Sequence, residues 1–420
     1  MPAAPTDASA PVAPGEHRVS GPDGPAGPDA VQVVWDPMFT RYDFGRWHPM
    51  APVRLDLTAR LCRELGLFDL PGVRVVSATP ADDALLMTVH DEAYVRAVQA
   101  ASAHPAQAQA AFGLGTEDDP AFPGMHEAAA RIVGGSVDLG RAVLAGRTLH
   151  GVNFTGGMHH ARPGSASGFC VYNDAAAAVV AMLADGAERV VYVDLDCHHG
   201  DGTETVFWDD PRVLTISVHE SGTTLFPGTG FADELGGPGA QGSAVNCALP
   251  ARTGDAGWLR AVHAVVPPLV AAFAPDVLVT QHGCDTHALD PLGHLQVSVD
   301  AQRVAATSMH ELAHSAAGGR WLALGGGGYE VVDVVPRTWA HLVAQACAHP
   351  VDPATPVPQA WREHVLATLG REAPRLMTDG EPATLTTWAS GYDPDDAVDR
   401  AILATRRAAF PLHGLDADFD

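Results

Sequence analysis

Lysine is absent from this sequence, so arginine supplies all 25 basic residues against 50 acidic ones, and the formal net charge is −25. Binding to a phosphate backbone needs clustered Lys and Arg, which this composition does not offer. An acidic surface chiefly keeps a protein in solution, although it also attracts cationic substrates. We therefore expect no nucleic-acid partner.

Closely spaced cysteine pairs and long apolar runs are missing as well. The six cysteines are scattered without a C-x-x-C pair, which favours a reducing compartment and no disulfide framework. The N-terminus lacks the basic and apolar segments of a signal peptide. No apolar stretch reaches the roughly 18 residues that would span a membrane. We expect a cytoplasmic protein without a membrane partner.

Aromatic residues make up only 6% of the chain, so its core must consist mostly of Ala, Val and Leu. Residues 1–29 are rich in Pro, Ala, Gly and Asp and cannot bury enough apolar surface to fold, which predicts a disordered tail. Residues 30–348 have the pattern of one large α/β domain. Residues 349–420, Pro-rich at first, are predicted to form a C-terminal appendage packed on that domain.

Short apolar runs alternate with Ala-rich stretches in the main domain. The predicted strands are Val31–Trp35, Leu149–Phe154, Arg189–Leu195, Val213–Val218, Val277–Thr280 and Trp321–Leu324. The predicted helices between them include Glu127–Ala145, Asp174–Ala184, Gly257–Phe273 and Ala301–Ala317. This alternation predicts an α/β fold with a parallel sheet covered on both faces, in which ligands bind beyond the carboxyl ends of the strands.

Four polar or glycine-rich clusters directly follow predicted strands. They are Gly156–His160, Asp194–Gly202, Gln281–Asp285 and Gly325–Tyr329. Because the carboxyl ends of parallel strands meet at one edge of a sheet, we expect these clusters to surround a common site.

The cluster D-L-D-C-H-H-G-D-G points to a metal ion. Residues two apart in an extended chain point to the same side, which places Asp194, Asp196 and His198 together. Two carboxylates held together repel each other unless a cation lies between them. Asp and His ligands suit Zn²⁺, and the oxygen-rich set also admits Fe²⁺. Asp285 can supply the third ligand of a catalytic site with an open position.

Further motifs occur in the same part of the chain, namely His90–Tyr94, Gly113–Asp118, Ser167–Asp174, Phe226–Gly230 and Asp290–Gly293. With the four clusters, from about Val31 to about Thr338, they resemble the zinc-dependent histone deacetylase superfamily, and within it the bacterial acetoin-utilisation type of protein deacetylase. The resemblance implies the three-layer αβα architecture, with a central parallel sheet, that arginases and deacetylases share.

The resemblance implies a role for each matching residue at the reaction centre. Asp196, His198 and Asp285 would bind the metal ion. His160 would act as general base and then as general acid, and Asp201 would orient it.

Other implied roles concern the surroundings of that centre. His159 would pair with Asp194, and Tyr329 would donate a hydrogen bond to the developing oxyanion. Phe169, beside Gly168, and Phe226 would line a narrow channel for the methylene chain of the substrate.

Asp118 would be the rim carboxylate that grips the substrate backbone, with Glu117 and Asp119 as alternatives in the same loop. A structural K⁺ site would use the backbone carbonyls of Asp194, Asp196 and His198 together with Ser217.

A competing metal motif occurs at His310-Glu311-Leu312-Ala313-His314, which matches the H-E-x-x-H pattern of zinc peptidases. The apolar residues of this segment share one helical face, which predicts that both imidazoles point to solvent. The extended peptidase pattern fails because Ala317 and Arg320 replace the required Gly and His. We expect two surface histidines here.

The resemblance implies hydrolysis of Nε-acetyl-lysine in a protein substrate, with an acyl-CoA synthetase as one candidate partner. An acetylpolyamine amidohydrolase and an arginase-like ureohydrolase are alternatives on the same scaffold. The first favours a channel closed by an insertion or a dimer, and the second needs extra carboxylates for two Mn²⁺ ions. A catalytically silent acyl-lysine-binding regulator belongs to another class. The presence of all the implied metal ligands, both imidazoles and Tyr329 argues against it.

Overall fold

The computed structural model describes residues 31–381 and 383–420, so the predicted tail at residues 1–29 lies outside the described part of the chain. The centre of the fold is an eight-stranded sheet with the order β2-β1-β3-β8-β7-β4-β5-β6. All neighbouring strands are parallel. The strands are β1 (Val31–Val34), β2 (Val73–Val76), β3 (His150–Asn153), β4 (Val190–Asp194), β5 (Val213–Glu220), β6 (Ala244–Leu249), β7 (Val277–Gln281) and β8 (Trp321–Leu324).

The predicted parallel sheet is confirmed, but the sequence missed its two edge strands, β2 and β6. The short strand β2 reads V-R-V-V and is partly exposed, so its pattern is weak. In β6 the buried polar Asn246 interrupts an otherwise apolar run. The central strands β3, β4 and β7 are buried along their whole length. In β4 and β7 this burial gives the mostly apolar runs that the sequence displays, whereas the equally buried β3 contains His150 and Asn153.

The α-helices are α1 (Val53–Glu64), α2 (Asp83–Leu86), α3 (Glu92–Ala103), α4 (Met125–Leu144), α5 (Asp174–Ala184), α6 (Asp201–Phe207), α7 (Asp255–Phe273), α8 (Val299–Ala316), α9 (Val335–Ala346), α10 (Gln359–Leu369) and α11 (Ala397–Ala409). Short 3-10 helices are η1 (Pro37–Arg41), η2 (Leu67–Asp69), η3 (Pro105–Gln107), η4 (Ala110–Phe112), η5 (Trp388–Ser390) and η6 (Phe410–His413).

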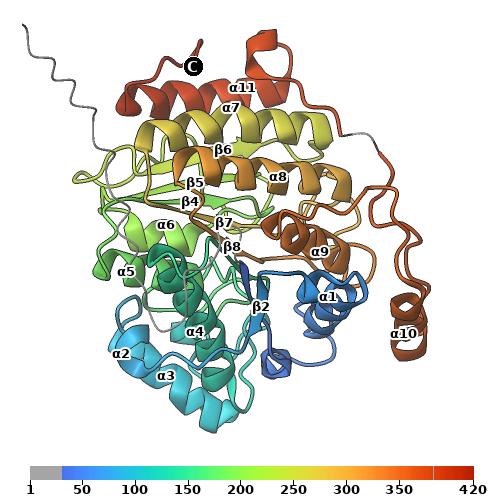
Figure 1. Cartoon of the computed structure of the whole chain (residues 1–420). Helices are drawn as coiled ribbons and strands as arrows, with labels where there is room; N and C mark the ends of the chain where they lie inside the picture. The colour runs from blue at the N-terminus through green and yellow to red at the C-terminus, as the bar shows by residue number, and fades with distance from the viewer. Residues whose placement is uncertain (1–30, 382) are drawn as a thin grey trace, which may run out of the picture.

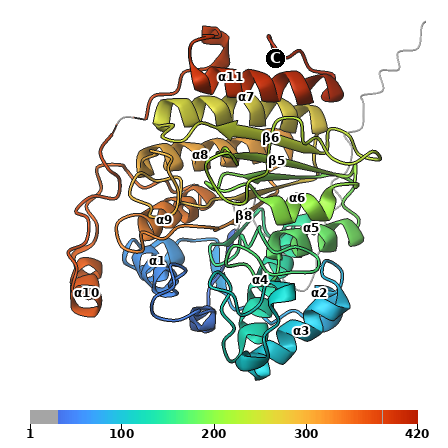
Figure 2. The same cartoon turned by 180° about the vertical axis from the view of Figure 1, so that it is seen from behind.

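Helices cover both faces of the sheet (Figures 1 and 2). Gly151 of β3 faces Leu139 of α4, whereas the adjacent His150 points to the opposite face and contacts His314 of α8. The helices α4, α5 and α6 form the layer on the first face, and α1, α9, α8 and α7 follow one another across the second. The fold is therefore the three-layer αβα arrangement.

Helix α7 is long and apolar enough, by length and composition, to cross a membrane, but 56% of its apolar window is buried inside the fold. It packs against β4, β5 and β6 on one side and against α11 on the other. Its buried Arg260 lies 2.5 Å from Asp399 of α11. These contacts are those of a core helix.

The C-terminal segment packs on the main body at two places (Figure 1). Trp361 of α10 donates a hydrogen bond of 2.8 Å to the carbonyl of Leu57 in α1. Thr405 of α11 donates one of 2.7 Å to the carbonyl of Asn246 in β6. These contacts join the C-terminal segment to the main body. The domain boundary near residue 349 stays a prediction.

Candidate active site and metal centre

The four predicted clusters follow β3, β4, β7 and β8, which are consecutive neighbours in the sheet. Their residues meet at the carboxyl edge, where they border a cavity of about 220 Å³. The cavity is lined by Asp118, His160, Gly168, Phe169, His198, Leu225, Phe226, Leu292 and Tyr329. Every residue that the sequence assigned to the substrate channel thus lines this cavity.

Three ligand atoms converge at the base of the cavity. Nδ1 of His198 lies 3.2 Å from Oδ1 of Asp196 and 3.0 Å from Oδ2 of Asp285. All three side chains are buried, and their ligand atoms lie within 4.8 Å of one another. Burial and the charge of Asp196 raise the pKa of Asp285, an electrostatic cost that a bound cation removes. This donor set fits a divalent cation that accepts both nitrogen and oxygen ligands.

The remaining carboxylate oxygens of this centre are held by other donors. Gln281 Nε2 and the Gly327 amide donate to Oδ2 of Asp196 at 2.7 and 2.9 Å. The amide of Cys197 donates to Oδ1 of Asp285 at 2.9 Å. Such partners orient a metal ligand before the ion binds. The sequence placed Gln281 in a cluster but gave it no role.

Two His–Asp pairs stand beside the centre. Nδ1 of His159 lies 2.8 Å from Asp194, and Nδ1 of His160 lies 2.7 Å from Asp201. Burial opposes a charge on His159, but Asp194 and Asp196 together outweigh it and raise the pKa of His159 to about 9. Burial and the neighbouring charge of His159 lower the pKa of His160 to about 4. The two imidazoles thus have opposite pKa shifts, which favour a charged His159 and a neutral His160.

The walls of the cavity are aromatic. The ring of Phe169 meets that of Tyr329 edge to face at 5.6 Å, and the ring of Phe226 lies 5.0 Å from that of His160. Asp118 lines the mouth and is exposed, whereas Asp119 is buried. The geometry therefore favours Asp118 over Asp119 as the rim carboxylate.

Comparison with known proteins decides the family of this fold and site. Residues 48–346 match the histone deacetylase domain. The acetoin utilization protein AcuC of Bacillus subtilis is 40% identical over 330 residues, which cover 78% of this chain and 84% of that protein. AcuC of Staphylococcus xylosus is 36% identical over 76% of this chain and 83% of its own. This chain belongs to the histone deacetylase family.

A solved structure agrees with that assignment. The crystal structure of the HDA15 HD domain matches with a TM-score of 0.70 and 27% identity, over 91% of this chain and 96% of that one. The fold is thus the arginase and deacetylase architecture, and the chain is an AcuC-like deacetylase of the hydrolase class.

Two residues to which the sequence analysis gave no role hold the loop Gly325–Tyr329 of this deacetylase. Buried Arg54 of α1 donates to the carbonyls of Gly326 and Gly328 at 2.9 and 3.0 Å. Asp290 accepts a hydrogen bond of 2.8 Å from the amide of Tyr329. Arg54 gave no signal in the sequence because its partners lie more than 270 positions away. Asp290 belongs to the motif Asp290–Gly293, but the sequence gave it no role.

The residues expected around a K⁺ ion also come together. Ser217 of β5 is the register partner of Asp194 in β4 and is buried. Its hydroxyl lies 2.7 Å from Nδ1 of His219.

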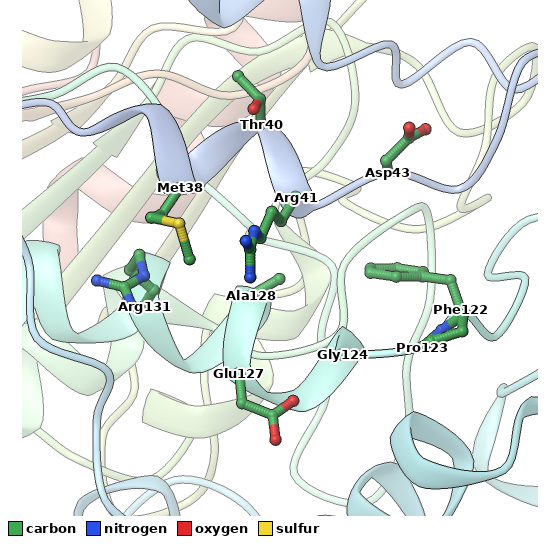
Figure 3. A pocket seen from close by; sticks show the side chains of 10 residues that line it. All are labelled: Met38, Thr40, Arg41, Asp43, Phe122, Pro123, Gly124, Glu127, Ala128 and Arg131. Atoms are coloured by element: carbon green, nitrogen blue, oxygen red, sulfur yellow. The ribbon is translucent and has the colours of Figure 1, made fainter.

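A larger hollow, of about 630 Å³, lies between η1 and the start of α4 (Figure 3). Its labelled side chains include two arginines, Arg41 and Arg131, and two acidic residues, Asp43 and Glu127. The hollow holds none of the four clusters. Side chains that the sequence assigned to the reaction border the smaller cavity instead.

The H-E-x-x-H segment lies on α8, apart from the active-site cavity, so the peptidase alternative receives no support from the placement of its histidines. The expectation of two solvent-facing imidazoles is wrong for His310. Its ring packs 5.6 Å from that of buried Trp321, whereas His314 is exposed.

Proposed function

We propose that this chain hydrolyses the acetyl amide of Nε-acetyl-lysine in protein substrates. The observation that carries the proposal is the shape of the cavity, because apolar Phe169 and Phe226 form its walls and polar His160, His198 and Tyr329 line it. A methylene chain would lie between the rings, with the amide at the polar base. A cavity with apolar walls and a polar base suits a long aliphatic amine whose terminal nitrogen is acylated.

Asp196, His198 and Asp285 would hold Zn²⁺, with Fe²⁺ as the alternative for this oxygen-rich set. When bound, such an ion polarises a carbonyl and lowers the pKa of water. A K⁺ ion beside Asp194 and Ser217 would stabilise the same loop.

The side chains of the protein would move the protons. Asp201 accepts from Nδ1 of His160, so Nε2 of His160 would take a proton from the attacking water and return it to the leaving amine. His159, charged beside Asp194, would stabilise negative charge nearby. The hydroxyl of Tyr329 would donate a hydrogen bond to the oxygen that becomes negative.

The mouth of the cavity supports a protein substrate. Exposed Asp118 would accept hydrogen bonds from the backbone amides that flank an acetyl-lysine. An acetylated acyl-CoA synthetase is a candidate partner, because two of the similar proteins are named for acetoin utilization.

The test compares an acetyl-lysine peptide with acetylputrescine, using metal-loaded protein and an Asp196→Ala control. We expect a higher kcat/KM for the peptide and no turnover in the control. Turnover of acetylputrescine alone would assign the site to polyamines instead, and turnover of neither would favour another acyl group or a binding role.

A further inference from the structure

A second group of potential metal ligands lies at the other end of the sheet from the active site, where the strands begin. His150 and Trp321 are the first residues of β3 and β8 and are register partners. His310 and His314 of α8 meet them there. The active-site clusters follow the carboxyl ends of the same two strands, so the length of the sheet separates the groups. We call His150, His310 and His314 the three-histidine cluster.

The imidazole nitrogens of this cluster converge. Nε2 of His314 lies 3.2 Å from Nε2 of His150 and 3.2 Å from Nε2 of His310. Two nitrogen ligands of a tetrahedral Zn²⁺ ion, each bonded at about 2.0–2.1 Å, lie roughly 3.3–3.4 Å apart. The observed spacing therefore matches a pair of ligands on one ion. A hydrogen bond would explain one such contact, but the single Nε2 of His314 makes both, and it offers either one hydrogen or one lone pair.

His150 has the partner that orients a metal ligand. Its Nδ1 donates a hydrogen bond of 2.6 Å to the carbonyl of Ala346, at the end of α9. In neutral imidazole this leaves a lone pair on Nε2, which is the atom facing His314. A ligating histidine almost always donates its other N–H to a carbonyl or carboxylate. The buried ring is thus fixed in the tautomer and direction that ligation needs.

Another group with metal-binding potential consists of His199, Glu204 and Glu234. It differs because other groups of the protein already contact its carboxylates. Glu204 already accepts from Asn246 at 2.7 Å and contacts His199 at 3.1 Å. Glu234 accepts from the amide of Gly230 at 2.6 Å. That group is satisfied by the protein itself.

We propose that the three-histidine cluster is a second metal site, which binds Zn²⁺ or a similar divalent transition metal through Nε2 of His150, His310 and His314. Three imidazoles without a carboxylate suit Zn²⁺, Cu²⁺ or Ni²⁺ rather than Mg²⁺ or Ca²⁺. His314 is exposed, so water can reach the open fourth position. The ion would join β3 to α8 across the second face of the sheet.

The site is a binding site rather than a peptidase centre. In zinc peptidases the Glu of H-E-x-x-H is the general base. Here Glu311 is exposed, and its charge acts on His263 of α7. The two histidines of the motif serve with His150 as ligands, whereas its glutamate takes no part.

The experiment counts metal per chain. Protein stripped with a chelator is reloaded with Zn²⁺, passed over a desalting column and analysed by mass spectrometry of the metal. We expect two equivalents in wild type, one in His310→Ala/His314→Ala, one in Asp196→Ala and none in the combined variant. His104→Ala, which removes an exposed histidine outside the cluster, should retain two.

A spectroscopic readout separates this site from the active site. In the Asp196→Ala background, one equivalent of Co²⁺ should produce a visible absorption band, and His310→Ala/His314→Ala should abolish it. Deacetylation by His310→Ala/His314→Ala in the wild-type background should stay unchanged. Equal metal content in wild type and His310→Ala/His314→Ala would overturn the proposal, with circular dichroism confirming that both are folded.

Discussion

Nδ1 of His160 lies 2.7 Å from Oδ1 of Asp201, and Arg162 donates two hydrogen bonds to the other oxygen of that carboxylate. This arrangement fixes the ring so that Nε2 remains for proton transfer. Asp201→Asn should lower kcat by about 10²–10⁴-fold, because the negative charge is lost and the single amide oxygen cannot accept from both His160 and Arg162. Steady-state kinetics would measure this, with KM little changed.

Asp185→Asn is the matched control, since Asp185 forms a surface ion pair with Arg141. Wild-type kcat in Asp201→Asn would contradict the assignment of His160 as the proton carrier.

Tyr329 should contribute to catalysis through its hydroxyl group alone. Tyr329→Phe keeps the ring that packs on Phe169 and should lower kcat by about 10²–10³-fold, the usual effect of losing one oxyanion donor. Binding of the acetyl-lysine peptide to this variant, measured by calorimetry, should match wild type. Tyr392→Phe, at an exposed tyrosine, should have no effect. Weaker peptide binding with unchanged kcat would show that Tyr329 acts on the ground state only.

Gly327 leaves room for the metal ligands. A methyl group added there would meet carboxylate oxygens of Asp285 and Asp196. Gly327→Ala should therefore weaken metal binding by about 10–100-fold or more, as changes around a ligand shell commonly do. Metal titration would measure the loss, with Gly239→Ala, where the added methyl has space, as the control. Unchanged affinity would show that the ligands can shift without penalty.

Arg260 and Asp399 join the C-terminal segment to the core. Both are buried, so Asp399→Ala leaves a buried guanidinium without its charge partner and should lower the free energy of unfolding by about 3–5 kcal/mol. Urea unfolding would measure this, and Asp395→Ala at an exposed position should change little. A midpoint equal to wild type would show that residues 349–420 are a separable appendage.

Asp119 should make stability depend on pH. Burial, followed by the charge of Asp118, raises the pKa of Asp119 to about 8, and its buried Oδ1 has no hydrogen-bond partner. Because the unfolded carboxyl loses its proton near pH 3.9, about four units lower, the free energy of unfolding should fall as pH rises through this window. Asp119→Asn should remove that slope and exceed wild type in stability above pH 8.

Urea unfolding at several pH values tests this, with exposed Glu117→Gln as the control. An unchanged slope in Asp119→Asn would contradict the raised pKa.

The sequence predicted the parts of the molecule that depend on local pattern. The central strands β4 and β7 are buried on both faces and appear as apolar runs, and the predicted metal ligands follow these strands directly. The role of Arg54 was not predictable, because Gly326 lies 272 positions away and only the fold brings them together. The edge strand β2 was missed because partial exposure lets polar residues interrupt it.

The three-histidine cluster shows the same limit. The spacing of His310 and His314 was evident, and a helix turned both to one side. Their partner His150 lies 164 positions before His314, in β3, so the sequence showed only two of the three proposed ligands, in a pattern that resembles a peptidase motif.

We propose that a metal ion held by Asp196, His198 and Asp285 is required for the hydrolysis of acetyl-lysine. The most direct measurement is acetate release from an acetyl-lysine peptide by chelator-treated protein before and after Zn²⁺ is restored, in wild type and in Asp285→Ala. We predict that chelation abolishes release and that Zn²⁺ restores it in wild type only. Full activity in the chelated protein, or in Asp285→Ala, would contradict the claim.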